Sequence, residues 1–471
     1  DFQGLSNLKD LILVANQITD IDQGDFDGLD SLEVLHLSAN EISNLDQGDF
    51  AGMTTLKEIY ISRNNLSSIE SGDFDGLDSL EKLYLLHNQI ATLDQGDFSG
   101  MGSLKHLSLD SNLLTSIDQG DFEGLDNLQI LESTNNQISS IESGSFANLS
   151  NLKELVLSEN ALTSIEEGDF AGLDNLKELE LQKNMIESIE SGDFDGLGNL
   201  EDLDLDDNQI SSIESGDFSG LNKLKFLDLG GNQIGSIEEG DFDGLSSLSV
   251  LNLSYNQISS IESEDFVGLN NLERLFLYGN QLRSIEAEDF AQLGDLKMLV
   301  LSNNQISIIE DYAFSGMDLQ QLMLDNNPDL KILNLRGADF SSLGLDNGHF
   351  DVTNSPVHTV ILKEAILNQT SFDRIMNNQI STVSGIAEIG GVKELDFGGV
   401  DFVAVGDLSK MYTMDDLMIL SFVDATNLLS AEVVELLDEL DSLCYLDVTG
   451  IWNQWYADGQ LSADQLALKQ W

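Results

Sequence analysis

Carboxylates are the side chains in this sequence with the clearest chemical potential. Five of the seven residues from 201 to 207 are acidic, and hard cations such as calcium bind several carboxylate oxygens at once. Four acids are therefore a candidate calcium site, namely Glu180, Asp204, Asp206 and Asp228. The alternative is a solvated acidic surface, since no EF-hand loop or calcium-binding nonapeptide accompanies these residues.

Aromatic residues and arginine form two further candidate sites. These residue types are enriched at the centres of protein interfaces, so exposed groups of them indicate contact sites. The first group contains Tyr60 and Tyr84, together with His36, Arg63, His87 and His106. The second group contains Phe226, Tyr255, Arg274, Phe276 and Tyr278, together with Val250. The alternative for both groups is scattered surface apolar residues without a function.

Catalytic chemistry has little support in the sequence. The chain has five histidines and one cysteine, Cys444, and none of them belongs to a nucleophile, metalloprotease or phosphate-binding motif. Acid pairs occur throughout, so they carry no information on glycoside hydrolysis. We therefore expect a protein that is not an enzyme and requires no cofactor. The formal charge of -64, from 84 acidic against 20 basic residues, also argues against nucleic acid as a partner.

A repeat of 24 residues must position all of these side chains. The consensus, L-x-x-L-x-L-x-x-N-x-I-x-x-I-E-x-G-D-F-x-G-L-x-x, places alternating leucines on a short strand and points the residues between them outward. One repeat cannot bury its own leucines, so stacked repeats must form the core. One asparagine marks each repeat, with a single 23-residue step at the end: Asn16, Asn40, Asn64, Asn88, Asn112, Asn136, Asn160, Asn184, Asn208, Asn232, Asn256, Asn280, Asn304 and Asn327.

This consensus resembles the leucine-rich repeat family, in the 24-residue form with a phenylalanine spine that is common outside cells. The resemblance implies an α/β solenoid, a leucine-rich-repeat horseshoe of about 19 coils with a parallel β-sheet on the concave face. It also implies that each asparagine bonds the backbone of adjacent coils. Phe218 and Leu221 would then close the far side of their coil, and Gly216 and Gly220 suit turns with unusual backbone angles.

The sequence divides into three regions. Residues 1–327 are regular 24-residue repeats, residues 328–451 are irregular leucine-rich repeats, and residues 452–471 form a C-terminal cap. We expect the irregular repeats to continue the same solenoid, with Ala338 and Ala365 at the first two asparagine positions. Helices are expected mainly in these C-terminal coils, at 371–376, 408–414, 430–440 and 462–469. The irregular strand signatures are Leu330/Leu333/Leu335, Val357/Val360/Leu362, Val392/Leu395/Phe397, Leu417/Leu420/Phe422 and Leu443/Leu446/Val448.

Two ladders of acids follow the asparagines along the loop side of the repeats. The sixth residue after each of the first thirteen asparagines is Asp or Glu, and the ninth is Asp in eleven repeats. Like charges about 5 Å apart repel by roughly 1 kcal/mol even in water, so something must offset them. We favour hydrogen bonds from the turn backbone for the second ladder, and the alternative is bound divalent cations.

The sequence favours a recognition protein. Solenoids usually bind partners through the concave face, where the outward residues vary from repeat to repeat while the loop side hardly changes. We expect a non-catalytic, extracellular or cell-surface adhesion module for a protein or glycan ligand, without a membrane span. The alternative is a structural subunit that assembles end to end into a filament, sheath or appendage with divalent cations. That alternative is motivated by the sequence starting inside a repeat, which would expose a strand edge.

Overall fold

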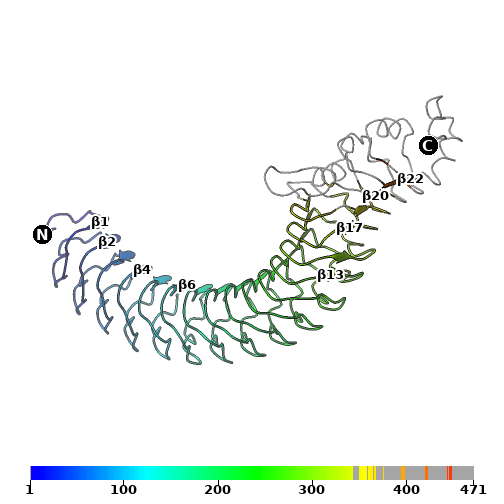
Figure 1. Ribbon diagram of the computed structural model, residues 1–471. Coiled ribbons are helices and arrows are strands. Elements are labelled where there is room, and N and C mark those ends of the chain that lie inside the picture. The colour runs from blue at the N-terminus through cyan, green and yellow to red at the C-terminus, as the bar shows by residue number, and fades with distance from the viewer. Residues whose placement is uncertain are drawn as a thin grey trace. The chain divides into compact units, whose positions relative to one another are not determined.

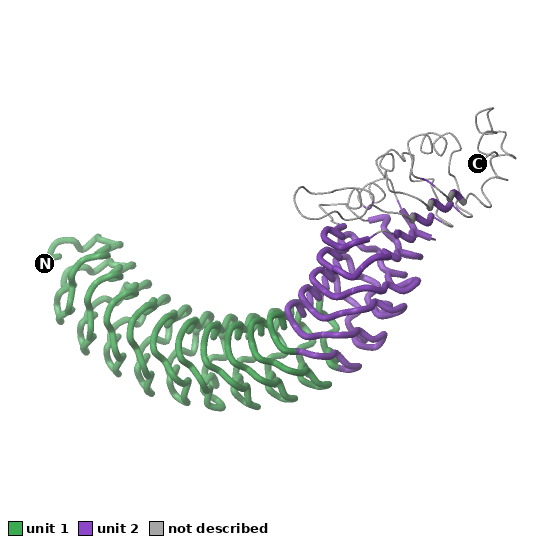
Figure 2. The backbone as a smooth tube through the Cα atoms, viewed as in Figure 1, with its two compact units in different colours: residues 1–233, 241–248 green, residues 234–240, 249–471 purple. Residues whose placement is uncertain are grey.

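The computed structural model describes residues 2–342, 350–357, 359–363, 365–367, 375, 394–397, 419–422, 443 and 445–447. This part of the chain is a parallel β-solenoid of about fifteen coils. It divides into two compact units, shown in Figure 2. The first unit contains residues 1–233 and 241–248, and the second contains residues 234–240 and 249–471.

The strands of the first unit are three residues long, and each coil contributes one. Their central residue is buried or nearly so, while the flanking residues face outward, as the alternation of the repeat predicts. In Figure 1 these strands follow one edge of the unit and the long turns follow the other. The strands are β1 Asp10–Ile12, β2 Val34–His36, β3 Glu58–Tyr60, β4 Lys82–Tyr84, β5 His106–Ser108, β6 Ile130–Glu132, β7 Glu154–Val156, β8 Glu178–Glu180, β9 Asp202–Asp204 and β10 Phe226–Asp228.

The second unit contains three groups of strands. The main sheet contains β11 Val250–Asn252, β12 Arg274–Phe276, β14 Met298–Val300, β16 Gln321–Met323 and β18 Phe350–Asp351. A two-stranded sheet contains β13 Ser284–Ile285 and β15 Ile308–Ile309. A five-stranded sheet contains β17 Ile332–Asn334, β19 Thr359–Ile361, β20 Glu394–Asp396, β21 Ile419–Ser421 and β22 Tyr445–Asp447.

The constant spacing of the repeat sets the register between coils. In the first unit each strand pairs in parallel with the strand 24 residues later, so that Leu203 of β9 lies beside Leu179 and Leu227. These leucines are fully buried. On the turn side, Phe218 is fully buried and its ring stacks 6.3 Å from that of Phe194. The predicted leucine core and phenylalanine spine are therefore both present.

The asparagine side chains join neighbouring coils, as the family resemblance implied. The Nδ2 of Asn208 donates to the carbonyl of Leu205 in its own coil at 3.1 Å and to that of Leu181 in the preceding coil at 3.0 Å. Its Oδ1 accepts a hydrogen bond from the backbone N–H of Ile186 at 3.1 Å. Because these backbone groups lie in a coil corner that no strand pairing reaches, the amide satisfies donors and acceptors that burial would otherwise leave unpaired.

The irregular region differs from our expectation. Its predicted strands exist, but β17 lies beside β15 and starts the five-stranded sheet, while β18 continues the main sheet. Leu322 of β16 pairs with Phe350 of β18, a step of 28 residues instead of 24. The asparagine position after Asn327 is therefore held by Ser355, which accepts from Asn327 N–H and donates to the carbonyl of Leu324. Our assignment of Ala338 to that position was wrong, because the longer coil moves the leucine-rich strand onto the turn side.

The expected C-terminal helices lie outside the described residues. Only Ile375 of the segment 371–376 is described, and its side chain is fully buried. The segments 408–414, 430–440 and 462–469 and the predicted cap are not among the residues that the structure describes. In the part of the chain that the structure does describe, no helix has the length and the apolar character that crossing a membrane requires.

One coil of the first unit carries a defect in its core. Ser133 occupies an inward position that is leucine in the coils on either side, Leu109 and Leu157, and it is 1% exposed. Its hydroxyl has no hydrogen-bond partner. A buried, unpaired hydroxyl costs stability, and so does the missing apolar volume.

We expect Ser133→Leu to raise the free energy of unfolding by about 1–3 kcal/mol, because it buries apolar area and removes an unpaired polar group. Urea denaturation followed by circular dichroism measures this change. Ser150→Leu is the matched control, since Ser150 is exposed on the turn side and should leave stability nearly unchanged. A destabilised Ser133→Leu variant would show that the coil has no room for leucine.

Candidate binding face

The outward side chains of β1 to β10 form a continuous surface on the first unit, which we call the strand face. Neighbouring parallel strands are about 4.8 Å apart, so equivalent residues of successive coils stand in columns. The pairing of Tyr60 with His36 and with Tyr84 confirms this column arrangement. The repeat thus brings together residues that are 24 positions apart in the sequence.

Four aromatic side chains stack in one stretch of this face, and we call them the aromatic ladder: His36, Tyr60, Tyr84 and His106. The rings of His36 and Tyr60 are parallel with centroids 4.1 Å apart. Those of Tyr60 and Tyr84 are parallel at 4.5 Å, and His106 meets Tyr84 edge-on at 5.0 Å. Each of the four side chains is partly exposed. The structure therefore joins the predicted Tyr60 and Tyr84 into one ordered surface with both histidines.

Polar partners hold the ladder in place. The hydroxyl of Tyr60 donates to Oε2 of Glu58 at 2.7 Å, and Lys82 pairs with Oε1 of the same carboxylate at 3.0 Å. Burial opposes ionisation of Glu58, but these two hydrogen bonds outweigh it and hold its pKa below the usual value. At the other end, Nε2 of His106 lies 3.1 Å from Oε2 of Glu132. This close contact with His106 lowers the pKa of Glu132, so both carboxylates are charged at neutral pH.

Two residues of the predicted first group do not join the ladder. Arg63 and His87 follow the strands in the left-handed backbone region, with φ near 58° and 55°, and their side chains are exposed. Conversely, our sequence analysis did not single out Glu58, Lys82 and Glu132, which complete the site. Their signal was present, because Glu58 and Lys82 occupy outward positions of the strands that carry Tyr60 and Tyr84. Glu132 occupies an outward position of β6, the strand next to that of His106.

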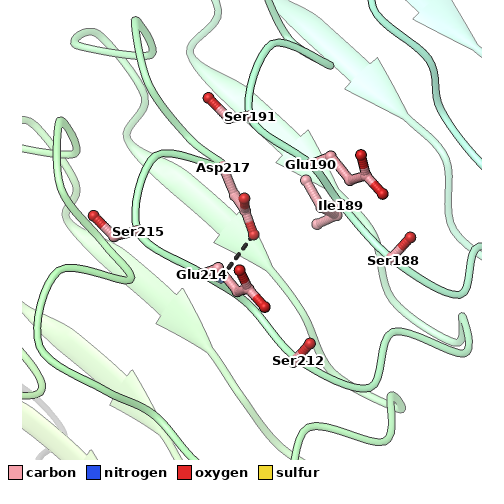
Figure 3. Close-up of a pocket in the computed structure, with 8 residues that line it drawn as sticks. All are labelled: Ser188, Ile189, Glu190, Ser191, Ser212, Glu214, Ser215 and Asp217. Atoms are coloured by element: carbon pink, nitrogen blue, oxygen red, sulfur yellow. Dashed lines mark hydrogen bonds between the residues drawn. The ribbon is translucent and has the colours of Figure 1, made fainter.

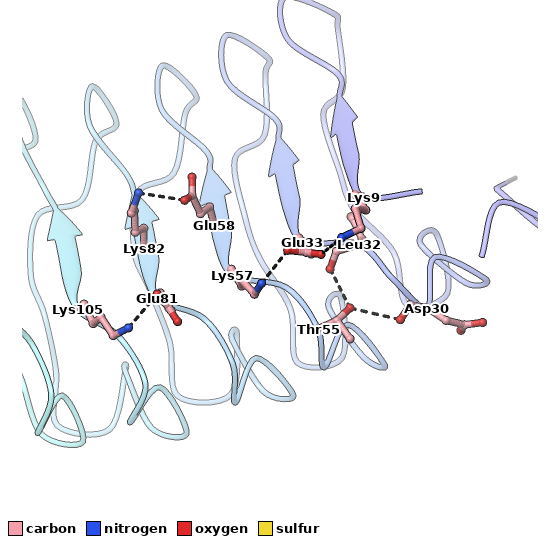
Figure 4. Close-up of polar contacts among 10 residues, drawn as sticks. All are labelled: Lys9, Asp30, Leu32, Glu33, Thr55, Lys57, Glu58, Glu81, Lys82 and Lys105. Carbon is pink, nitrogen blue, oxygen red and sulfur yellow. Dashed lines mark hydrogen bonds and ion pairs between the residues drawn. The ribbon is translucent and has the colours of Figure 1, made fainter. Parts of the chain in front are cut away.

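A row of ion pairs runs along the edge of the strand face, just before each strand begins (Figure 4). Glu33 lies between Lys9 and Lys57, with Nζ to carboxylate distances of 2.5 and 2.7 Å. Hydrogen bonds from these two lysines lower the pKa of Glu33 to about 2. The pattern recurs at Glu201, between Lys177 and Lys225, at 2.6 Å on both sides. At this edge, acids and lysines from neighbouring coils are matched.

The strand face itself lacks this matching from β7 to β9. Five carboxylates stand there in two columns, and we call them the acidic strip: Glu154, Glu178, Glu180, Asp202 and Asp204. Strand pairing sets Glu178 beside Glu154 and Asp202, and Glu180 beside Asp204. Burial and neighbouring acids raise the pKa of Asp202 to about 6 and that of Asp204 to about 7. Burial contributes most to these pKa shifts, and the neighbouring carboxylates add to it.

The predicted calcium ligands lie on or beside this strip. Strand pairing sets Asp204 between Glu180 and Asp228, as expected from the 24-residue spacing. Asp204 Oδ1 also accepts a hydrogen bond from the backbone N–H of Asp206 at 2.9 Å. Among the described residues, no group of three or more His, Cys, Asp or Glu side chains is arranged to hold a metal ion. A calcium site at these residues stays a prediction.

The second predicted aromatic group does not form one described cluster. Phe226 belongs to the first unit, whereas the other members belong to the second. There, the rings of Tyr255 and Tyr278 meet edge-on with centroids 4.9 Å apart. Tyr255 is 62% exposed and lies over Gly279, where a Cβ atom would approach its ring to 2.9 Å. Arg274 is exposed. In the pairing of β11 with β12, Arg274 stands beside Val250 and Phe276 stands beside Asn252.

The turn side carries the acid ladders, and the second one is explained by backbone hydrogen bonds. Oδ2 of Asp217 accepts from the backbone N–H of Glu214 at 2.7 Å, and the same contact recurs in nine other described coils. A pocket of about 300 Å³ opens here between two coils (Figure 3). Serines 188, 191, 212 and 215 line it with Ile189, Glu190, Glu214 and Asp217. The expected role of the second ladder in local turn bonding is confirmed.

Comparison with known proteins agrees with this architecture. The family model described as leucine rich repeat matches residues 2–42, 30–90, 80–138, 126–186, 174–234, 227–282 and 278–328. No curated protein matches the chain. Among solved structures, the Toll chain of a Drosophila Toll–Spätzle complex is 22% identical with a TM-score of 0.69, covering 81% of this chain and 54% of its own length. This chain thus spans about half of that Toll chain.

A bacterial structure is similar over almost its whole length. A leucine-rich repeat protein of Leptospira interrogans is 25% identical with a TM-score of 0.57, covering 87% of this chain and 95% of its own. Leucine-rich repeats generally form protein-interaction surfaces and not catalytic sites. The family matches together span residues 2–328, well over half of the sequence. The chain belongs to the leucine-rich repeat family.

Proposed function

We propose that this protein is a non-catalytic recognition module that binds a protein or glycan partner through the strand face of its first unit. The observation that carries the proposal is the aromatic ladder, in which four ordered, partly exposed rings share one surface. Rings of this kind supply large contact areas at low cost in conformational entropy. In the complete solenoid, a horseshoe of about 19 coils would place this face on the concave side.

The family supports a role in binding. The Toll structure is a complex with a protein, Spätzle, and stacked repeats offer an extended surface of this kind. We place the protein at the cell surface or outside the cell, since its repeats have the form that is common there. Tyr255, Arg274, Phe276 and Tyr278 of the second unit remain a second candidate contact site, and calcium remains a candidate ion at Glu180, Asp204, Asp206 and Asp228.

Replacing two rings tests the proposal. The full chain would be screened for binding to arrays of secreted proteins and of glycans. The affinity of each binder would then be measured for the natural protein and for the variant Tyr60→Ala/Tyr84→Ala. Loss of two central aromatic contacts should weaken binding by about 30-fold or more. Met185→Ala is the control, since Met185 is 40% exposed and follows its asparagine outside the strands. Binders that tolerate the double variant as well as the control would contradict the proposal.

Solution mass separates recognition from assembly. Light scattering of the full chain, with millimolar calcium and then with chelator, should show a monomer in both conditions. Growth into end-to-end polymers would favour the structural subunit. Loss of such polymers on chelation would show that assembly requires cations bound to the carboxylates.

A further inference from the structure

Tyr60, inside the aromatic ladder, does not present a ring face to a ligand. Tyr60 is covered on one side by His36 at 4.1 Å and on the other by Tyr84 at 4.5 Å, both parallel to it. A sugar that stacks on an aromatic side chain needs an open face, whereas Tyr60 is partly exposed with both faces covered and so is open at its edge. Ring edges pack well against the aliphatic stems of long side chains, such as those of lysine and arginine.

Carboxylates stand along the ladder, where the charged heads of such side chains would reach. Glu58 lies beside Tyr60, and Glu132 lies beside His106. Glu132 also starts the acidic part of the face, because its strand β6 pairs with β7, where the acidic strip begins. Rings and carboxylates therefore form one continuous surface from β2 to β9.

The charge on this surface points to the partner. At the edge of the same strands, each of Glu33, Glu81 and Glu201 has a lysine partner from a neighbouring coil. On the face, Glu178, Asp202 and Asp204 stand beside other acids. Positive charge brought beside these paired carboxylates would relieve the repulsion between neighbouring strands.

We propose that the strand face binds an extended protein segment rich in lysine and arginine, whose stems pack on the ring edges of the aromatic ladder and whose charged heads pair with the acidic strip. This inference rests on the proposed function and selects a basic protein partner over a glycan. Several strands about 4.8 Å apart give room for such a segment to cross the coils.

The test uses a fluorescent deca-arginine peptide and the full chain, with anisotropy as the measure of binding. The strip variant Glu178→Gln/Asp202→Asn/Asp204→Asn should weaken affinity about tenfold or more, since each partly buried ion pair is worth roughly 0.5–1 kcal/mol. The control Glu167→Gln/Glu190→Gln/Glu214→Gln removes three exposed acids from the turn side and changes the net charge equally. It should weaken binding less than about twofold.

The ladder variant Tyr60→Ala/Tyr84→Ala adds a readout that general attraction to an acidic protein would not give. It leaves the net charge unchanged, so its affinity for the peptide should fall only if arginine stems pack on these rings. We expect a loss of about fivefold or more. Equal loss of affinity in both triple variants would overturn the inference. If array binders depend on Tyr60 and Tyr84 but not on the strip, the proposed function survives and the basic partner is wrong.

Discussion

The protein should unfold at a higher temperature at pH 5 than at pH 8. Eight aspartates of the second acid ladder are 3–4% exposed, and burial raises their pKa above the usual value: Asp49, Asp73, Asp97, Asp121, Asp169, Asp193, Asp217 and Asp289. The pKa of Asp73, Asp121 and Asp193 rises to about 6, and that of Asp289 to about 7. The folded state therefore holds protons that the unfolded chain has already released in this range, and it loses stability as pH rises from about 4.5 through 7.

The expected effect is large because the ladder repeats. A shift of one pKa unit is worth about 1.4 kcal/mol, so even if solvent screening halves this value, these four aspartates give several kcal/mol between pH 5 and pH 8. Below about pH 4.5 the trend should reverse. Their lysines lower the pKa of Glu33 and Glu201 to about 2. The ion pairs of these two glutamates therefore stabilise the fold fully above about pH 4.5, and this stabilisation is lost as the pH falls from there towards 2.

Thermal unfolding followed by circular dichroism at pH 5, 6, 7 and 8 and constant ionic strength measures this dependence. The variant Asp73→Asn/Asp121→Asn/Asp193→Asn keeps an acceptor oxygen for each turn but cannot ionise. It should melt above the natural protein at pH 8 and show a flatter profile. A melting temperature that rises from pH 5 to pH 8 would contradict the raised pKa values. If calcium at pH 8 raised the melting temperature more than a monovalent salt of equal ionic strength does, that result would instead favour divalent cations bound to the second acid ladder.

Phe218→Ala should lower the free energy of unfolding by about 3–5 kcal/mol, because it leaves a cavity in a core that cannot collapse around it. The ring is fully buried and stacks on that of Phe194. In a solenoid each coil contacts only its neighbours, so the cavity weakens the coupling between coils on either side. We therefore also expect the single unfolding transition to broaden or to split into two.

Phe226→Ala provides a control that is eight residues away in the same repeat. It removes the same atoms, but Phe226 points outward from β10 and is only partly buried. Urea denaturation should show a loss of about 1 kcal/mol or less for this variant. Equal losses for Phe218→Ala and Phe226→Ala would mean that the phenylalanine spine does not carry the stability of the coil.

The sequence by itself determined the coil. A repeat of constant length fixes which residues point inward, so the sequence alone assigns Leu203, Phe218 and Asn208 to their places in the coil. It also placed Tyr60 beside Tyr84, and Glu180 beside Asp204, because a constant offset makes every column predictable. This works because each coil meets only its neighbours, so that information local to one repeat describes the whole stack.

The tertiary structure decided what constant spacing cannot. Rotamers and ring contacts turned four separate aromatic positions into one stacked ladder, and the depth of the turns set the raised pKa values of the buried aspartates. Where the step lengthens to 28 residues at β18, the leucine pattern near β17 still predicted a strand but not the sheet that it joins. That choice depends on packing between residues far apart in the chain, which a repeat pattern specifies only while its period holds.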